Sequence, residues 1–296
     1  MSLYIKLHNQ QQFFDLLLAT LKLSQAQAAR LFDMPKTTMS AYCRREIGLP
    51  KSLFIYLCSF AKLDIKTFKG TEYNASNSEK KIKIPVLDKY LANFLGILAG
   101  DGHVSDYCYE VSVVGDKDLD KQFLSKHVFC LFEKLFGLEP HFKLQDNALT
   151  CRVYSKKLME LLNKTYNVPL RKKKNKLHIP NVILKNKILL KSYLRGVFDT
   201  DGSFHRHHKN TAAVEIISGD VNFLEEIKQS LTSLDFNPCK SGKSVYLYRS
   251  NEIHRFFREI SSDNEKHLKK YHFYKTRGYL PLQDKLMRWS YRSRFR

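Results

Sequence analysis

The stretch Phe94-Leu-Gly-Ile-Leu-Ala-Gly-Asp101-Gly102 is followed one hundred residues later by Leu194-Arg-Gly-Val-Phe-Asp-Thr-Asp201-Gly202. Each stretch is an apolar run that carries an early glycine, Gly96 or Gly196, and ends in Asp-Gly. An apolar run inside a longer segment favours a helix over a strand, and a helix that is apolar on nearly every face must be buried all round. The repeat therefore predicts two buried helices with matching roles.

Small residues on one face of the first predicted helix indicate a close contact between helices. Gly96 and Gly100 are four residues apart, so they lie on one face and allow another backbone to approach. Gly196 and Thr200 repeat this face less fully. The simplest arrangement packs the two helices against each other and brings their C-terminal ends together.

An aspartate ends each of these helices, which is an unfavourable place for a carboxylate. Asp101 and Asp201 would lie at the negative ends of two helix dipoles and would repel each other. A cation between them removes both penalties, and two carboxylates around Mg²⁺ provide a way to cleave a phosphodiester. We therefore expect a divalent-cation site at Asp101 and Asp201, with the preceding residues Gly100 and Thr200 as part of it.

The two stretches resemble the LAGLIDADG motif of homing endonucleases, in its two-motif, single-chain form. In that family the eighth motif position is the metal-binding acidic residue, which is Asp101 or Asp201 here. The sixth position is Ala99 in the first copy and Asp199 in the second, a departure that leaves the catalytic position intact. Two unrelated buried helices that end in Asp-Gly are the alternative, and two copies in matching contexts argue against it.

The resemblance implies a function in intron homing. A relative of this kind hydrolyses both strands of double-stranded DNA near the centre of a long and poorly symmetric site. It would use Mg²⁺, or another divalent cation such as Mn²⁺. The family often adds central basic residues near the start of the helix that follows the second hairpin, and the matching positions make Lys156 and Arg249 candidates for stabilising the phosphate.

The composition agrees with a polyanionic partner. The 296 residues include 50 Lys and Arg against 29 Asp and Glu, for a formal net charge of +21. An excess of this size most often indicates nucleic acid, although a membrane surface or an acidic protein would also fit the charge alone. The 16 Tyr and 20 Phe supply enough core material to argue against a disordered basic chain.

The cysteine pattern and the N-terminus bear on where the protein works. The six cysteines show no CxxC pair and no framework spacing, which favours free thiols in a reducing compartment. No signal-peptide pattern opens the sequence, and no apolar run reaches membrane-spanning length. We expect a soluble, cytoplasmic or otherwise intracellular protein without a membrane partner; the pattern does not separate a prokaryotic cytoplasm from an organelle or nucleus.

The N-terminal region, residues 1–70, is expected to be a small all-α domain. Ser24 is a good N-cap for a helix over 25–32. The segment 33–35 then interrupts the pattern before a polar helix over 36–45. This order resembles a repressor-type helix-turn-helix, with Asp33 where glycine is usual in the turn; aspartate tolerates the left-handed conformation better than most residues.

In the helix-turn-helix geometry the polar helix over 36–45 enters the major groove of DNA. The candidates for base contacts are its early polar residues Lys36, Thr37, Thr38 and Ser40. Arg44 or Arg45, near its end, is the candidate for a phosphate contact. A plain helical bundle used for dimerisation is the alternative.

The rest of the chain predicts an α+β fold built from two pseudo-symmetric αββαββα halves. Matched turn and cap positions recur in order: Gly115-Asp116 with Gly219-Asp220, Pro140 with Pro238, and Ser155 with Ser250. The expected boundaries are a linker over 71–85, a first half over 86–169, a basic linker over 170–180, a second half over 181–262, and a basic C-terminal extension over 263–296. In this extension the segment Tyr279-Leu-Pro-Leu and Trp289 could pack on the body, and the rest is expected to contact phosphate or to be disordered.

Each half would present an antiparallel sheet with one polar face toward a DNA groove. The candidates for DNA contacts on the second sheet are His205, Arg206, His207, Lys240 and Lys243, although a solvated sheet face would account for any one of them. The run Arg171–Lys176 between the halves is expected to touch phosphate. A zinc site at His205, His207 and His208 has little support, because no Cys or carboxylate lies at ligand spacing nearby.

Two other functions remain open from the sequence. A non-cutting DNA-binding regulator can combine a degenerate LAGLIDADG core with a helix-turn-helix, and an intron maturase uses the same scaffold on intron RNA. The two motif aspartates argue against the regulator, while sequence does not separate nuclease from maturase. Two motifs in one chain predict a monomer, because the symmetry partner is already present.

Overall fold

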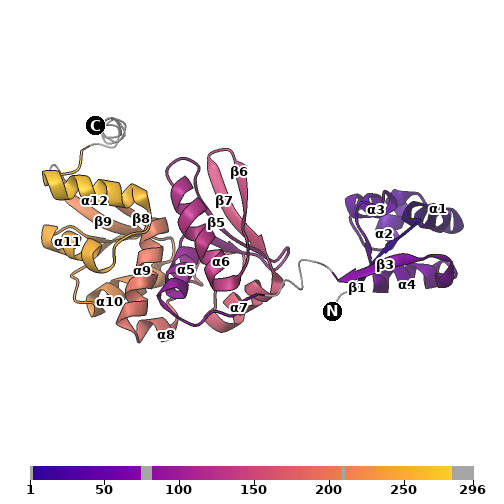
Figure 1. Cartoon of the computed structure of the whole chain (residues 1–296), viewed down its shortest axis with the longest axis horizontal. Coiled ribbons are helices and arrows are strands. Elements are labelled where there is room, and N and C mark those ends of the chain that lie inside the picture. The colour runs from indigo at the N-terminus through magenta and orange to yellow at the C-terminus, as the bar shows by residue number, and fades with distance from the viewer. Residues whose placement is uncertain (1–2, 75–81, 209–210, 282–296) are drawn as a thin grey trace. The chain divides into compact units, whose positions relative to one another are not determined.

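A computed structural model of the chain describes residues 3–74, 82–208 and 211–281 (Figure 1). The chain divides into two compact units, Met1–Lys80 and Lys81–Arg296, and each is described by itself. Within the described residues, no helix has both the length and the apolar character needed to cross a membrane.

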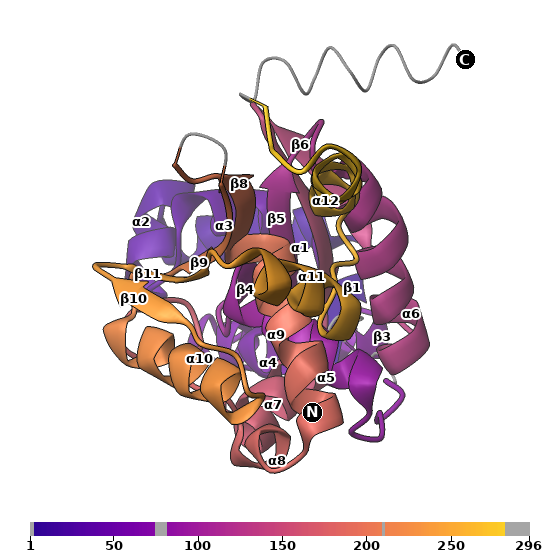
Figure 2. The same cartoon turned by 90° about the vertical axis from the view of Figure 1, so that its left-hand side faces the viewer.

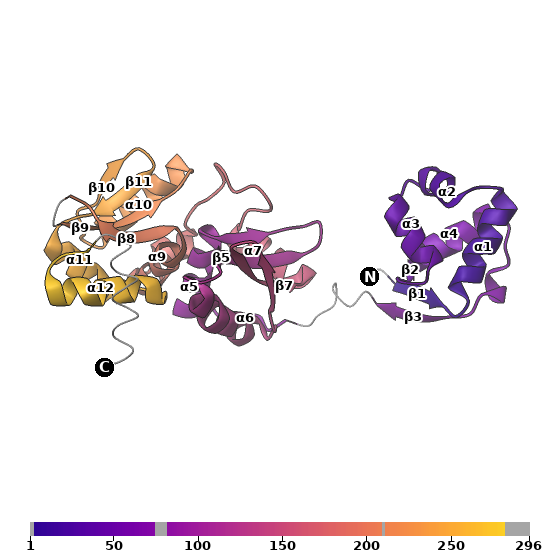
Figure 3. The same cartoon turned by 90° about the horizontal axis from the view of Figure 1, so that it is seen from above.

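The N-terminal unit packs its helices on one side of a small sheet (Figure 3). The antiparallel strand order is β2-β1-β3. A buried cluster that includes Phe13, Phe14 and Phe54 joins the helices. The elements in order are β1 (Leu3–Leu7), α1 (Gln10–Leu21), α2 (Gln25–Leu31), α3 (Lys36–Cys43), β2 (Leu49–Pro50), α4 (Lys51–Phe60), the 3₁₀ turn η1 (Ile65–Thr67) and β3 (Gly70–Asn74).

This sheet corrects two expectations. The unit is not all-α, because Leu3–Leu7 form β1, which pairs along its length with β3. The linker expected over 71–85 therefore begins later, since residues 71–74 belong to β3. Short strands with mixed side chains carry little periodic signal, and the paired residues of β1 and β3 lie more than sixty residues apart in the chain.

The second unit repeats one supersecondary pattern. Its first half contains α5 (Lys89–Ala99), β4 (Gly102–Val104), β5 (Glu110–Asp116), a π-helical turn η2 (Phe123–Val128), α6 (Phe129–Phe136), β6 (His141–Gln145), β7 (Ala148–Tyr154) and α7 (Lys156–Tyr166). Its second half contains α8 (Asn181–Leu184), α9 (Lys187–Asp201), β8 (Gly202–Arg206), β9 (Ala212–Ile217), α10 (Val221–Ser233), β10 (Cys239–Ser241), β11 (Ser244–Leu247), α11 (Ser250–Glu259) and α12 (Glu265–Arg277).

The two sheets have the same strand order. It is β4-β5-β7-β6 in the first half and β8-β9-β11-β10 in the second, antiparallel throughout. The motif helices also begin alike: Asp88 accepts two backbone N–H groups at the start of α5, and Asn186 does the same for α9. The predicted α+β fold with an internal duplication is confirmed.

Helices α5 and α9 lie side by side in the middle of this unit, with one sheet on each side (Figures 1 and 2). Their backbones touch at the two early glycines. A Cβ on Gly96 would lie 2.1 Å from the carbonyl oxygen of Tyr193, and one on Gly196 would lie 2.2 Å from that of Asn93. No side chain fits at either position, so the prediction that the glycine faces meet is confirmed.

The C-terminal extension differs from the expectation over its described part. Residues 265–277 form α12, which packs beside β8 and buries Phe273 and Tyr274 against the second half (Figure 1). A dense run of Lys and Arg hid the apolar face of this helix from sequence reasoning. Residues 282–296, the remainder of the expected extension, lie outside the described residues.

The two matched serines do not play the same part. Ser155 is buried and accepts the backbone N–H of Leu158, so it caps α7 as predicted. Ser250 is instead the first residue of α11, and Arg249 occupies the cap position without a side-chain hydrogen bond.

Candidate active site

The two motif aspartates lie at neighbouring helix ends. Helix α5 ends at Ala99 with Gly100 as its C-cap, and α9 continues through Asp201. A Cβ on Gly100 would lie 2.0 Å from Thr200 Oγ1 and 3.3 Å from the carboxyl carbon of Asp201. The close approach of the glycine faces therefore continues to the C-terminal ends and brings the two carboxylates into one site.

The site disfavours negative charge. Burial raises the pKa of Asp201 to about 7, with a further increase from the negative charge of Asp101, while Lys173 opposes both. Partial desolvation also raises the pKa of Asp101, which keeps contact with solvent, with Lys266 opposing and Asp120 adding to the effect. Two carboxylates with raised pKa values at two helix C-termini form a place where a cation is stabilised.

Lys173, from the connection between the halves, supplies one positive charge. Its Nζ donates hydrogen bonds to the carbonyl oxygens of Leu98 (2.7 Å) and Gly100 (2.7 Å), and a longer one to that of Ala99 (3.4 Å). Burial lowers its pKa to about 8, although Asp201 and Asp101 favour the charged form. The ammonium group thus lies at the end of α5 within the field of both aspartates.

Lys266, from α12, supplies a second positive charge. Its Nζ lies 2.8 Å from Oδ1 of Asp120, which also accepts a hydrogen bond from the side-chain amide of Asn264 at 2.7 Å. Asp120 and Asp101 line a hollow of about 680 Å³ that also includes Asp116 and the β6–β7 turn. Asp101 itself is exposed, so a ligand can reach its carboxylate.

The oxygen donors fit a hard divalent cation. Carboxylates and backbone carbonyls suit Mg²⁺ and Mn²⁺, and Mg²⁺ is often held by one or two carboxylates together with waters and substrate phosphate. In the part of the chain that the structure describes, no group of three or more His, Cys, Asp and Glu side chains could hold a metal. The oxygen donors that could hold such an ion are Asp101, Asp201 and the Gly100 carbonyl. The Thr200 hydroxyl already donates to the carbonyls of Gly196 and Val197.

The predicted DNA contacts on the second sheet fall into separate places. His205 and His207 share its outer face, where they line a hollow of about 240 Å³ with Glu215 and Tyr246. Lys243 is exposed in the β10–β11 turn, and its carbonyl oxygen accepts the N–H of Ser218 at the end of the sheet nearest Asp201.

Arg206 and Lys240 do not share that outer face. Arg206 lies two residues after the buried Phe204 on β8 and therefore on the same face, and Lys240 pairs with the buried Val245. Both strands thus direct these residues to the helix side. Lys240 forms an ion pair of 2.8 Å with Glu225 of α10. Because successive side chains of a strand point to opposite faces of the sheet, basic residues that are neighbours in the sequence lie on different faces.

The candidate phosphate-stabilising residues Lys156 and Arg249 lie at the far ends of the sheets from the aspartates. The N–H of Val114 bonds to the carbonyl of Asp101, whereas Tyr154, just before Lys156, pairs with Glu110. Val114 and Glu110 are four residues apart along β5, which corresponds to roughly 13 Å at about 3.3 Å per residue. Lys156 Nζ lies 5.8 Å from the ring centroid of Tyr109, and Arg249 lies 5.9 Å from that of Tyr248.

The helix-turn-helix has the expected local geometry. Ser24 and Gln27 form a capping box on α2, and Asp33 adopts a left-handed conformation with φ of 48° in the turn. On α3, Lys36, Thr37 and Arg44 are exposed. Thr38 and Ser40 are half-buried, and Arg44 pairs with Glu46 at 2.8 Å.

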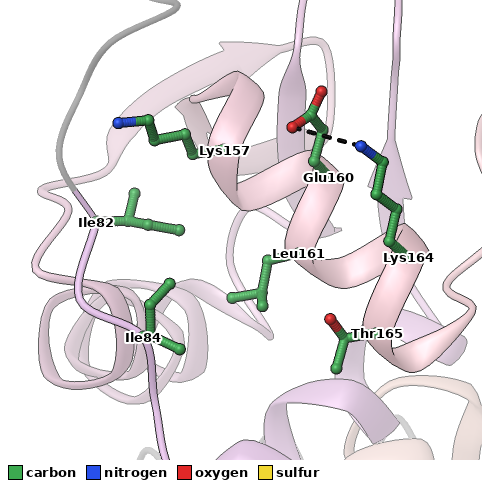
Figure 4. Close-up of a pocket in the computed structure, with 7 residues that line it drawn as sticks. All are labelled: Ile82, Ile84, Lys157, Glu160, Leu161, Lys164 and Thr165. Carbon is green, nitrogen blue, oxygen red and sulfur yellow. Dashed lines mark ion pairs between the residues drawn. The ribbon is translucent and has the colours of Figure 1, made fainter.

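Another hollow, of about 510 Å³, lies away from the motif aspartates. Ile82 and Ile84 face Leu161 of α7 across it, while Glu160 and Lys164 form an ion pair of 3.7 Å on its rim (Figure 4). It contains no motif residue, and its lining is mostly apolar with lysines at the edge.

Several residues of the site had no clear signal in the sequence. Lys173 lies inside a run of similar basic residues, and Lys266 and Asn264 belong to a segment expected to be an extension. Asp120 follows a turn and gives no periodic pattern. Only long-range packing brings these four residues to the aspartates.

Comparisons with known families give one match in each compact unit of the chain. Residues 189–261 match the LAGLIDADG-like domain, and residues 21–50 match the helix-turn-helix Psq domain. Each compact unit therefore resembles one known family over the matched residues. A search of curated proteins found no match.

Solved structures with a similar fold include a homing endonuclease and a second protein. The homing endonuclease I-DmoI in complex with DNA and Ca is 17% identical, covers 62% of this chain and 98% of its own, and gives a TM-score of 0.46. I-DmoI with DNA and Mn is 15% identical over 58% of this chain and 96% of its own, with a TM-score of 0.42. Full-length DUF199/WhiA from Thermatoga maritima is 12% identical, covers 71% of this chain and 68% of its own, and gives a TM-score of 0.43.

Proposed function

We propose that this protein is a site-specific endonuclease that cuts both strands of duplex DNA. The observation that carries the proposal is the contact between the C-terminal ends of α5 and α9, which brings Asp101 and Asp201 into one site on the pseudo-two-fold axis. A pair of carboxylates related in this way suits two scissile phosphates on opposite strands, because the strands of duplex DNA are also related by a two-fold axis.

The charge and the N-terminal unit support duplex DNA as the partner. A net charge of +21 favours a polyanion. The exposed side of α3 offers Lys36, Thr37 and Arg44 to a major groove, and the second sheet offers His205 and His207. Contacts of both kinds in a single chain suit a long and poorly symmetric site read by a monomer.

The aspartates would hold the divalent cation, with Mg²⁺ or Mn²⁺ as the candidates. When bound, such an ion supplies activation of water and stabilises charge on the phosphate. Asp101 and Asp201 orient the site through the rigid ends of α5 and α9. Lys266 fixes Asp120 beside Asp101, and Lys243 lies at the sheet end where a phosphate backbone would pass.

A direct test uses duplex DNA that spans the uninterrupted insertion site of the protein's own gene, with Mg²⁺ or with EDTA at low salt. Asp101→Asn and Asp201→Asn should each retain DNA binding and lose double-strand cutting by at least about a hundredfold, since one carboxylate of the pair is gone. Asp235→Asn, which changes an exposed carboxylate elsewhere, should cut normally. Normal cutting of both strands by Asp201→Asn would show that the assignment is wrong.

A DNA-binding regulator that does not cut is a second candidate, and one observation favours it. The Lys173 ammonium already places positive charge beside the two carboxylates, so the site can persist without a metal. Tight binding to the same duplex with no Mg²⁺-dependent cutting, in wild type and Asp201→Asn alike, would support the regulator over the nuclease.

A further inference from the structure

All three donors of the Lys173 ammonium are directed at the C-terminal end of α5. They bond to the carbonyl oxygens of Leu98, Ala99 and Gly100. Such carbonyls have no partner within a helix and carry its negative partial charge. The ammonium is therefore satisfied without a carboxylate partner, while both motif carboxylates remain close enough to act on its charge.

The chain on both sides of Lys173 is fixed to the body of the second unit. On one side Arg171 donates its backbone N–H to the carbonyl of Val104 at 2.7 Å and pairs with Asp106. On the other side the N–H of Leu177 bonds to Asp220 at 3.2 Å. The connection is therefore bonded to the first half on one side of Lys173 and to the second half on the other. These bonds hold the Lys173 side chain at one position, which a mobile basic loop would not do.

The place it occupies includes one oxygen that a divalent cation at the two aspartates would also use, the Gly100 carbonyl. The Gly100 carbonyl accepts a hydrogen bond from Lys173, and the same residue faces the carboxyl group of Asp201 across the helix contact. An ammonium and a divalent cation would both bind this carbonyl oxygen, and the two like charges repel at such short range. They cannot both take the same position.

We propose that Lys173 is a built-in counter-cation that holds the Gly100 carbonyl beside the two aspartates in the metal-free protein, so that a metal binds there only when the ammonium leaves this oxygen. The inference rests on the proposed metal site at Asp101 and Asp201. It explains how two carboxylates at two helix C-termini remain together before a metal arrives. The flexible four-carbon side chain of lysine allows the head group to move away while the backbone stays fixed.

The test measures Mn²⁺ binding to the full-length protein without DNA, by calorimetry or by the loss of free-Mn²⁺ electron paramagnetic resonance. Lys173→Met removes the charge but keeps the length of the side chain, and it should bind Mn²⁺ at least about tenfold more tightly than wild type. Lys172→Met and Lys174→Met remove the same charge from exposed neighbours and should change the affinity less than about threefold. Lys173→Arg keeps the charge and should stay close to wild type.

A second variant ties the signal to the motif aspartates. Asp101→Asn in the Lys173→Met background should abolish the gain in affinity. Thermal melts with and without Mn²⁺ should show a larger metal-dependent rise in melting temperature for Lys173→Met than for wild type, which a mere helix cap would not produce. Circular dichroism checks that each variant is folded, and Lys173→Gln replaces the methionine variant if it is not.

Two results would overturn the inference, and they are distinguishable from failure of the proposed function. Unchanged or weaker Mn²⁺ binding in Lys173→Met, with wild-type binding still abolished by Asp101→Asn, shows that Lys173 only caps α5 and leaves the metal site standing. Mn²⁺ binding that Asp101→Asn does not affect in either background refutes the metal site itself, and the inference with it.

Discussion

The side-chain amide of Asn264 donates a hydrogen bond of 2.7 Å to Asp120, which lies 144 residues earlier in the chain. Asn264 precedes α12 in the second half, whereas Asp120 precedes the helix of the first half. The same amide also donates to the carbonyl oxygen of Asp199 in α9. One buried side chain therefore connects both halves and a motif helix beside the candidate active site.

Replacing this side chain should weaken the second unit. Asn264→Ala leaves buried hydrogen-bonding groups without partners, and we expect the free energy of unfolding to fall by about 1–3 kcal/mol. Glu265→Ala, at the neighbouring and more exposed position, should cost less than about 0.5 kcal/mol. Urea unfolding monitored by circular dichroism provides both values, and equal losses for the two variants would contradict the role given to Asn264.

The glycine contact between the motif helices predicts a second loss of stability. Gly96→Ala would place a methyl group 2.1 Å from the carbonyl oxygen of Tyr193, so the helices must separate. We expect a loss of roughly 3 kcal/mol. Gly219→Ala is the matched control, because nothing lies within 4 Å of its added Cβ. Thermal or urea unfolding that shows similar effects for the two substitutions would count against tight packing at Gly96.

A pH-dependent contribution to stability is expected from Glu259, which joins α11 to α9. Hydrogen bonds from Lys191 and Arg255, each 2.8 Å long, lower the pKa of its carboxyl to about 2. A lowered pKa in the folded state stabilises the protein above about pH 4.5, and this contribution is lost as the pH falls toward 2. Glu259→Gln should therefore cost on the order of 1–2 kcal/mol at pH 7.

The measurement compares wild type and Glu259→Gln by urea unfolding at pH 7 and at pH 3. The difference between the two proteins should shrink at pH 3, since the wild-type carboxyl then loses part of its advantage. Glu160→Gln, in a single longer ion pair with Lys164, should show little pH-dependent difference. A Glu259→Gln penalty that stays constant with pH would indicate that packing, rather than charge, carries the effect.

The exposed side of α3 predicts two kinds of effect on DNA binding. Thr37→Ala should cost about 1–3 kcal/mol on the specific site and little on random duplex, if the side chain reads a base edge. Lys36→Ala should weaken binding to both and reduce the slope of log K against log salt by about 1. Lys66→Ala removes an exposed charge elsewhere in the same unit and serves as the control. Salt titrations by fluorescence anisotropy measure all three, and identical behaviour of Lys36→Ala and Lys66→Ala would remove α3 from the interface.

Several features could be predicted because they depend on local pattern. The Asp-Gly endings, the glycines four residues apart and the repeated turn residues are enough to predict two buried helices and a duplicated α+β unit. Ser24 and Ser155 follow from capping chemistry, which acts over three residues. Asp33 in a left-handed conformation follows from the break between two short helices.

Other features could not be predicted because they depend on pairing between distant segments. The β1–β3 pair joins residues near the two ends of the N-terminal unit, and neither strand has a strong pattern of its own. Whether Lys240 faces DNA or Glu225 depends on the register of β10 against β11, in which a shift of one residue reverses every side chain. Lysines in similar sequence contexts therefore lie in different environments.

The sequence by itself determined that two helices end in Asp-Gly and that small residues allow them to pack, because helical periodicity and backbone sterics act over a few residues. Only the tertiary structure decided which positive charges accompany Asp101 and Asp201. It selected Lys173 from a run of equivalent lysines and brought Lys266 from the last described helix, while it left Lys156 and Arg249 at the far ends of the sheets. The physical reason is that the position of a charged group depends on the long-range packing of the element that carries it. The charge of a residue and its spacing along the chain do not indicate that packing.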